Sequence, residues 1–228
     1  MKYYTLRISL VAVLCSLLSI CSAQEETTAY FKIGLVGTEV LDSTGEMVDM
    51  IDMMAEMMSK DIEKEYMVSG NRIMEYKTDV TGQLTSFSIY DHDTKTKMSY
   101  GELDLEKVYT TYDAQSMSQF SAPNGTTVTF DKEQKQIHGY KCSSFIMDGS
   151  DDMKMITYYT EKIPMVNQLP EGKEGMPLEI HMQMGGISII TGVVEHNDKL
   201  PHPEFFKVNT SEYKKVSNEE FPKSRGMF

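Results

Sequence analysis

The stretch "HGYKCSSFIMDGSDDMKMITYYTEKIP", residues 138–164, decides the fold class. Residues 139–147 and 153–160 are rich in aromatic and β-branched side chains, and the "DGSDD" between them is a cluster of turn formers. Two runs of this kind around a short turn are typical of a β-hairpin. The stretch therefore predicts two antiparallel strands, with Cys142 in the middle of the first.

The same alternation of short β-prone runs and turn residues extends over most of the chain. Strands are predicted within 29–40, on both sides of Ser69-Gly70-Asn71, and within 177–198, where Gly185-Gly186 supplies a two-residue hairpin turn. The run "VYTTYDAQ" (108–115) is ambiguous. Strands and helices do not alternate in βαβ fashion, and no repeat or Pro/Gly-rich linker divides the chain. These features predict about ten mostly antiparallel strands in a single domain.

One segment departs from the strand pattern. Ser43 and Glu46 form a capping-box pair, and apolar side chains then recur at helical spacing as far as about residue 63. This predicts an amphipathic helix near 44–63. Its apolar arc covers roughly 220° of a helical wheel, against about 100° for simple one-sided packing. The methionines of this arc include Met47, Met50, Met54, Met57 and Met58.

The first 23 residues have the three parts of an export signal. Lys2 and Arg7 form a basic start, residues 8–20 an apolar run, and residues 21–23 a small-residue cleavage site. The apolar run is shorter than the roughly 20 residues that a membrane-spanning helix needs. We therefore predict a signal peptide over 1–23, an exported domain over 24–228 that is periplasmic or secreted, and no membrane span.

The composition limits the partners and the redox chemistry of the chain. Its formal net charge is -12, so it is repelled by phosphate backbones and anionic lipids, and nucleic acid is not an expected partner. Of its three cysteines, Cys15 and Cys21 fall in the predicted signal. Acylation at either is an alternative, which the large residue before each of them disfavours. Cys142 alone remains, so the mature domain has no internal disulfide.

No arrangement of residues in the sequence specifies catalysis. A reactive thiol needs a nearby cation or histidine, whereas Cys142 lies mid-strand and is interpreted as a small buried hydrophobe. We predict that the protein is not an enzyme and binds no cofactor. Thioethers at helical spacing can converge on Cu(I), but the histidines form no pair at metal spacing, so we predict no metal site and keep copper as an alternative. The histidines are His92, His138, His181, His196 and His202.

The C-terminal half resembles a known group of proteins. A Gly-Tyr-x-Cys strand, an aromatic-Thr strand ending near "IP", a "PLE" strand and the closing "FFKVNTSEYKKVS" occur in this order over roughly 138–217. This order resembles a bacterial envelope domain-of-unknown-function family related to the GLPGLI family. "EGMPLEI" stands where the name motif of the second family is expected, and the Met-rich helix has no match. The resemblance implies a half-barrel like that of periplasmic lipoprotein carriers, with a helix over its concave side, and implies no catalytic residue.

Together these observations predict a mainly β (α+β) protein. We expect a curled antiparallel sheet or half-barrel of about ten strands, with one Met-rich amphipathic helix over its concave face. The expected function is binding or carrying an apolar, lipid-like ligand, and the expected ligand-binding residues are Met50, Met54, Met57 and Met58. The alternative is a non-enzymatic structural or interaction module that contacts another envelope protein, and the third possibility is Met-based Cu(I) binding.

Overall fold

The computed structural model describes residues 27–40, 63–78, 81–113, 117, 122, 125–149, 153–165, 169–184 and 186–221. In these ranges the chain forms twelve strands, three short 3-10 helices and no α-helix. The strands are β1 (Thr28–Val40), β2 (Lys64–Ser69), β3 (Arg72–Thr78), β4 (Leu84–Asp91), β5 (Thr96–Leu103), β6 (Glu106–Asp113), β7 (Thr127–Ile137), β8 (Tyr140–Asp148), β9 (Lys154–Thr160), β10 (Met176–Met184), β11 (Ile187–Asn197) and β12 (Lys214–Lys215). The 3-10 helices are η1 (Pro170–Gly172), η2 (Pro203–Phe206) and η3 (Thr210–Glu212).

All twelve strands belong to one sheet, in the order β12-β6-β5-β4-β3-β2-β1-β11-β10-β9-β8-β7. The strands β1 to β6 form one antiparallel meander and β7 to β11 form another. The pairing of β1 with β11 joins the two meanders, and the short β12 runs parallel to β6. The outermost strands, β7 and β12, are not paired with each other, so the sheet is open.

The hairpins predicted from turn residues are confirmed. Strands β8 and β9 pair on either side of the "DGSDD" turn, as the opening stretch predicted. Met184 pairs with Ile187, which leaves two residues for the turn between β10 and β11. Gly186 in that turn has a φ of 82°, in the left-handed region that glycine adopts without a steric penalty.

The predicted architecture is wrong. We expected a curled antiparallel sheet or half-barrel of about ten strands, with a Met-rich amphipathic helix over its concave face. The described residues form one open sheet of twelve strands and contain no α-helix. The segment predicted as that helix, 44–63, falls almost entirely on residues 41–62, which lie outside the described ranges. The strand number rises because the ambiguous run 108–115 contributes to β6 and the C-terminal region contributes β12.

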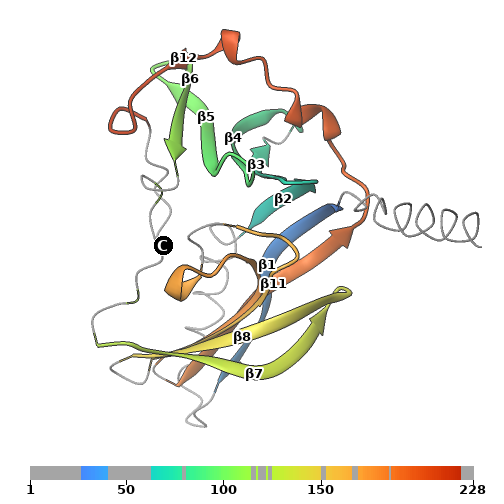
Figure 1. Cartoon of the computed structure of the whole chain (residues 1–228), viewed down its shortest axis with the longest axis vertical. Helices are drawn as coiled ribbons and strands as arrows, with labels where there is room; N and C mark the ends of the chain where they lie inside the picture. The colour runs from blue at the N-terminus through green and yellow to red at the C-terminus, as the bar shows by residue number, and fades with distance from the viewer. Residues whose placement is uncertain are drawn as a thin grey trace, which may run out of the picture.

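The sheet covers its inner face by bending on itself. Figure 1 shows β2 to β6 in one half and β7 and β8 in the other, with β1 and β11 between them. Side chains from both halves meet in one hydrophobic cluster, the inner core, without any helix among the described residues. Its buried members are Ala29, Phe31, Tyr66, Val68, Ile73, Tyr90, Ile137, Cys142, Ile163, Met176, Leu178 and Val193.

An ion-pair cluster joins the two halves at their rim. Glu174, which precedes β10, accepts hydrogen bonds from the Lys95 ammonium at 2.8 and 3.0 Å. Its Oε2 also lies 2.8 Å from Nε2 of His92. Both partners belong to the turn between β4 and β5, in the other meander. The cluster therefore connects loops that are about 80 residues apart in sequence and far apart in the strand order.

We expect Glu174→Gln to lower the free energy of unfolding by less than about 1 kcal/mol near neutral pH, because the cluster is partly exposed. The hydrogen bond from Lys95 lowers the pKa of Glu174. A carboxyl group with a lowered folded-state pKa stabilises the fold above its unfolded-state pKa, and this contribution is lost as the pH falls. Urea unfolding of wild type and variant should therefore differ near neutral pH and converge once the pH falls below the lowered pKa of Glu174. A difference that persists there would contradict this role, and Glu171→Gln in the same loop is the control.

The outer face of the β1–β6 half is covered by the C-terminal strap, which we define as residues 198–216. In Figure 1 the strap runs from the end of β11 along the outside of this half to β12. It packs Leu200, Phe205, Phe206, Val208 and Tyr213 against a second cluster, the outer core. The buried outer-core residues are Tyr30, Met67, Met74, Tyr76, Phe87, Ile89 and Tyr100.

Aromatic contacts hold the strap in place. The Tyr213 ring meets the rings of Phe87 and Tyr100 edge-on, with centroids 6.4 and 5.0 Å away. The Phe205 ring lies edge-on to Tyr76 at 5.8 Å. Edge-to-face pairs of this kind stabilise a fold beyond the burial of their area. This half of the sheet is consequently buried on both faces.

Candidate functional site

The ligand-binding residues predicted from the sequence cannot be placed. Met50, Met54, Met57 and Met58 fall within 41–62, outside the described residues. The apolar-ligand and copper hypotheses that depended on them stay predictions. The described residues contain no group of three or more histidine, cysteine or acidic side chains arranged to hold a metal ion.

Cys142 occupies the position expected of a small buried hydrophobe. It is fully buried in the inner core, and its thiol lies 3.5 Å from the carbonyl oxygen of Tyr140. Burial raises the pKa of the thiol to about 11, so the nucleophilic thiolate is scarce at neutral pH. The sequence interpretation of this residue is confirmed.

We expect Cys142 in the native protein to react with iodoacetamide at least about a hundredfold more slowly than in urea, because both burial and the raised pKa suppress the thiolate. Mass spectrometry of samples quenched over time gives the two rates. A native rate close to that of the unfolded chain would contradict the buried position.

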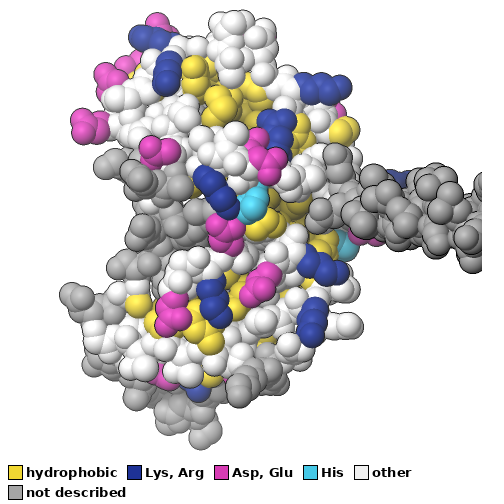
Figure 2. Space-filling model, viewed as in Figure 1, with side chains coloured by type: hydrophobic (Ala, Val, Ile, Leu, Met, Phe, Trp, Pro, Cys, Tyr) yellow, Lys and Arg dark blue, Asp and Glu magenta, His cyan; other side chains and the backbone are white. Residues whose placement is uncertain are grey.

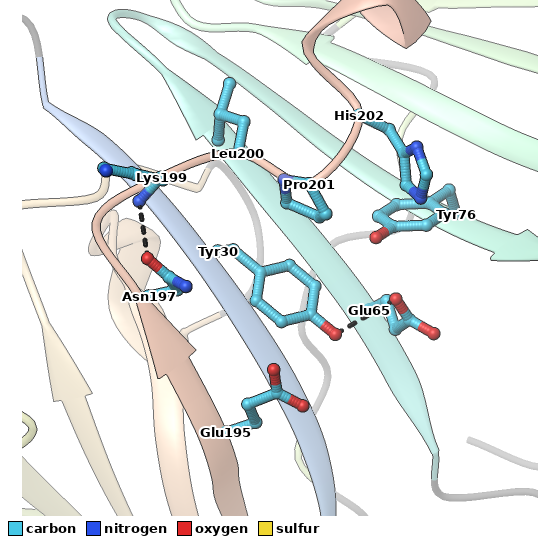
Figure 3. A pocket seen from close by; sticks show the side chains of 9 residues that line it. All are labelled: Tyr30, Glu65, Tyr76, Glu195, Asn197, Lys199, Leu200, Pro201 and His202. Carbon is cyan, nitrogen blue, oxygen red and sulfur yellow. Dashed lines mark hydrogen bonds between the residues drawn. The ribbon is translucent and has the colours of Figure 1, made fainter.

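A cavity of about 350 Å³ lies where the strap leaves β11 and crosses the outer face of the sheet. Strands β1, β2, β3 and β11 form its floor, and the first residues of the strap form its roof (Figure 3). Its lining is polar and aromatic. The lining residues are Tyr30, Glu65, Tyr76, Glu195, Asn197, Lys199, Leu200, Pro201 and His202.

Strand register explains why the two acidic side chains lie on the same floor. Across four neighbouring strands, Tyr76 pairs with Glu65, Glu65 with Lys32, and Lys32 with Glu195. Directly opposite residues in a sheet place their side chains on the same face. Tyr30 lies two positions before Lys32 and so shares this face. The cavity floor thus carries two carboxylates and two phenols.

The roof is a short, bent segment. The backbone N–H of Lys199 donates to Oδ1 of Asn197 at 2.9 Å, which turns the chain immediately after β11. Pro201 and His202 then pass over the floor, and the His202 ring meets that of Tyr76 edge-on at 6.5 Å. In Figure 3 the Lys199 side chain points away from the two carboxylates.

The two tyrosines differ in how their hydroxyl groups are satisfied. Tyr30 donates to Oε2 of Glu65 at 3.1 Å. Tyr76 is only 2% exposed, and its hydroxyl has no hydrogen-bond partner among the described residues. Figure 3 shows this hydroxyl directed into the space between Tyr30, Pro201 and Glu65. A buried hydroxyl without a partner is unfavourable, and few native groups are left in this state.

Both phenols are protonated at neutral pH. Burial, followed by the nearby Glu65 carboxylate, raises the pKa of Tyr30 and of Tyr76 far above the ordinary value. Each hydroxyl therefore keeps its proton as a hydrogen-bond donor. Glu65 is close enough to both phenols to act on their pKa values, but only Tyr30 meets it with the geometry of a hydrogen bond.

Sequence reasoning missed this site because no local pattern marks it. Glu65 and Glu195 are 130 positions apart and are brought together only by the pairing of β1 with both β2 and β11. In a chain with 34 acidic residues, no single glutamate stands out. A weak signal does exist, because "KEYMVS" places Glu65 two positions before Met67, on the face that carries the buried residues of the outer core.

The molecular surface shows no charged patch of a single sign on the face seen in Figure 2. Acidic and basic side chains are interspersed there, with apolar side chains between them. Among the described residues, no helix is long and apolar enough to cross a membrane.

Comparison with known proteins identifies no family. No protein-family model matches the chain, and no curated protein matches it. Similar solved structures include PNGF-II in the P21 space group, with 8% identity over 86% of this chain and 32% of that chain, and a TM-score of 0.49. PNGF-II in the C2 space group has 9% identity over 84% of this chain and 31% of that chain, with a TM-score of 0.47. An uncharacterized conserved protein from Thermus thermophilus has 9% identity over 90% of this chain and 99% of that chain, with a TM-score of 0.37.

These likenesses are distant. The chain spans about a third of the length of the PNGF-II chains, and similarity at this level carries no argument about function. The resemblance to bacterial envelope families accordingly stays a prediction.

Proposed function

We propose that the protein is a non-enzymatic binding module, exported from the cell, that takes a small hydrophilic ligand into the cavity beneath the C-terminal strap. The observation that carries this proposal is the Tyr76 hydroxyl, which is buried, faces the cavity and has no partner among the described residues. A ligand group that forms a hydrogen bond with this hydroxyl would remove the free-energy cost of leaving it buried without a partner.

The lining supports a hydrophilic ligand rather than a lipid. Carboxylate, phenol and amide groups surround the cavity, and its volume of about 350 Å³ lies at the lower end of the range for small-molecule pockets. An acyl chain would form no hydrogen bonds with these polar groups and would displace the water that solvates them.

A thermal-shift screen of the purified protein tests the proposal. The library comprises sugars, amino sugars, polyols, amino acids and small amines, and the screen uses wild type, Tyr76→Phe and Tyr112→Phe. The last variant removes a phenol hydroxyl from β6, outside the cavity. We expect at least one compound to raise the melting temperature of wild type and Tyr112→Phe and to act more weakly on Tyr76→Phe. A compound present at about 100 times its Kd stabilises the fold by about 2.7 kcal/mol, a shift that is easily measured.

The screen also has clear contrary results. No stabilising compound in the library, or compounds that stabilise Tyr76→Phe as strongly as wild type, would refute the proposed use of this cavity.

A further inference from the structure

Building on the proposed function, we propose that the ligand is a small ammonium ion that carries hydroxyl groups, as an amino sugar does. The inference rests on the charge of the cavity floor, on the hydrogen-bonding capacity of its groups and on the size of the cavity.

The charge of the cavity floor favours a cation. Among the described residues, no cationic side chain forms a salt bridge with Glu65 or Glu195. Lys32, which stands between them in the register, pairs instead with Glu63 at 3.4 Å. Lys199 is directed away from both carboxylates in Figure 3. Within the described part of the chain the two carboxylates outnumber the one ammonium that lies between them, and the overall charge of -12 adds to the attraction for cations.

The hydrogen-bonding groups favour N–H donors. The two carboxyl groups can accept several hydrogen bonds, and only one of those on Glu65 is taken by Tyr30. An ammonium group supplies three N–H donors at one point, and charge-assisted hydrogen bonds to carboxylates are the strongest available here.

The free Tyr76 hydroxyl explains why the ligand should also carry hydroxyl groups. Its proton is not used by any described residue, so it needs an acceptor that an ammonium ion cannot provide. A ligand hydroxyl accepts this hydrogen bond and donates another to a neighbouring carboxylate. The cavity volume of about 350 Å³ suits a ligand of monosaccharide size.

Isothermal titration calorimetry with matched probes tests the inference. The probes are glucosamine in its protonated form, neutral glucose, anionic glucuronate, and choline, which is a hydroxylated cation without N–H donors. We expect glucosamine to bind at least about tenfold more tightly than glucose, which lacks the positive charge, or choline, which lacks N–H donors. We expect no binding of glucuronate, because it is an anion.

Isosteric variants locate the site. Glu65→Gln and Glu195→Gln each remove one negative charge from the cavity floor, and Glu102→Gln removes one from β5 outside the cavity. We expect a loss of glucosamine affinity of about tenfold or more for Glu65→Gln, a smaller loss for the more exposed Glu195, and an unchanged affinity for Glu102→Gln. Equal losses in all three variants would mean that only the overall charge attracts the probe, and would overturn the assigned site.

The outcomes separate this inference from the proposed function. Glucose binding as tightly as glucosamine, with a loss in Tyr76→Phe, overturns the cationic ligand and leaves the cavity as a binding site. Choline binding as tightly as glucosamine overturns the requirement for N–H donors. If none of the four probes binds, the inference is wrong, and the wider screen with Tyr76→Phe decides whether the cavity binds any ligand.

Discussion

Removal of the C-terminal strap is expected to unfold the β1–β6 half of the sheet. A chain that stops after Asn197 loses the cover of the outer core, in which seven side chains are buried. Exposing each large apolar side chain costs about 1.5–3 kcal/mol, so the total is comparable with the roughly 5–15 kcal/mol that stabilises a typical domain. Circular dichroism should show no cooperative melting of the full sheet, and the truncated protein should bind a hydrophobic dye.

Full-length variants test the same claim without deleting chain. Phe205→Ala and Tyr213→Ala each remove a ring that packs edge-on against the outer core. We expect each to lower the free energy of unfolding by about 1–3 kcal/mol, below the value for fully buried aromatics because both rings are only half-buried. The control is Leu105→Ala, whose side chain is 90% exposed and should change stability by less than about 0.5 kcal/mol. Losses no larger than that of the control would show that the strap does not cover the sheet in solution.

Replacing the two cavity tyrosines by phenylalanine is expected to have opposite effects, although both changes delete the same atom. Tyr76→Phe removes a buried hydroxyl that lacks a partner among the described residues, and should raise the free energy of unfolding by about 1 kcal/mol. Tyr30→Phe removes the donor to the Glu65 carboxylate, and should lower it by about 1.5–3 kcal/mol, as is usual for hydrogen bonds to charged groups. Urea denaturation measures both values.

The sign for Tyr76 is the informative part of this pair. If Tyr76→Phe lowered the free energy of unfolding by as much as Tyr30→Phe does, the Tyr76 hydroxyl would be hydrogen-bonded in the ligand-free protein. The reason for placing a ligand beside it would then disappear. Tyr112→Phe provides the reference for deleting a phenol hydroxyl elsewhere in the sheet.

The parts of the fold that could be predicted from the sequence are those set by local chemistry. The Gly185-Gly186 turn and the "DGSDD" turn identify hairpins because turn residues fix the backbone locally. The burial of Cys142 follows from its place in a β-prone run. Each of these features depends on residues that are close in sequence.

The parts that could not be predicted depend on contacts between distant segments. The pairing of β1 with β11 joins residues more than 145 positions apart, and no local pattern specifies it. The apolar residues of the strap, among them Leu200, Phe205 and Tyr213, do not recur at helix or strand spacing. Their positions follow the surface of the outer core, against which they pack. We therefore assigned the covering of the sheet to the one strongly periodic segment, near 44–63, and missed the role of the C-terminal region.

The cavity was missed for the same reason. Its two carboxylates come from β2 and β11, its phenols from β1 and β3, and its roof from the strap. Strand register alone brings these groups together. The expected site at Met50, Met54, Met57 and Met58 was instead inferred from a single amphipathic pattern and lies outside the described residues.

The claim that a ligand completes the unpaired Tyr76 hydroxyl is tested most directly by a thermodynamic cycle. Free energies of unfolding are measured for wild type and Tyr76→Phe, each without ligand and with saturating glucosamine. We predict that Tyr76→Phe is the more stable protein without glucosamine, and that glucosamine stabilises wild type by about 1 kcal/mol more than the variant. Equal stabilisation of the two proteins, or none of either, would contradict this account.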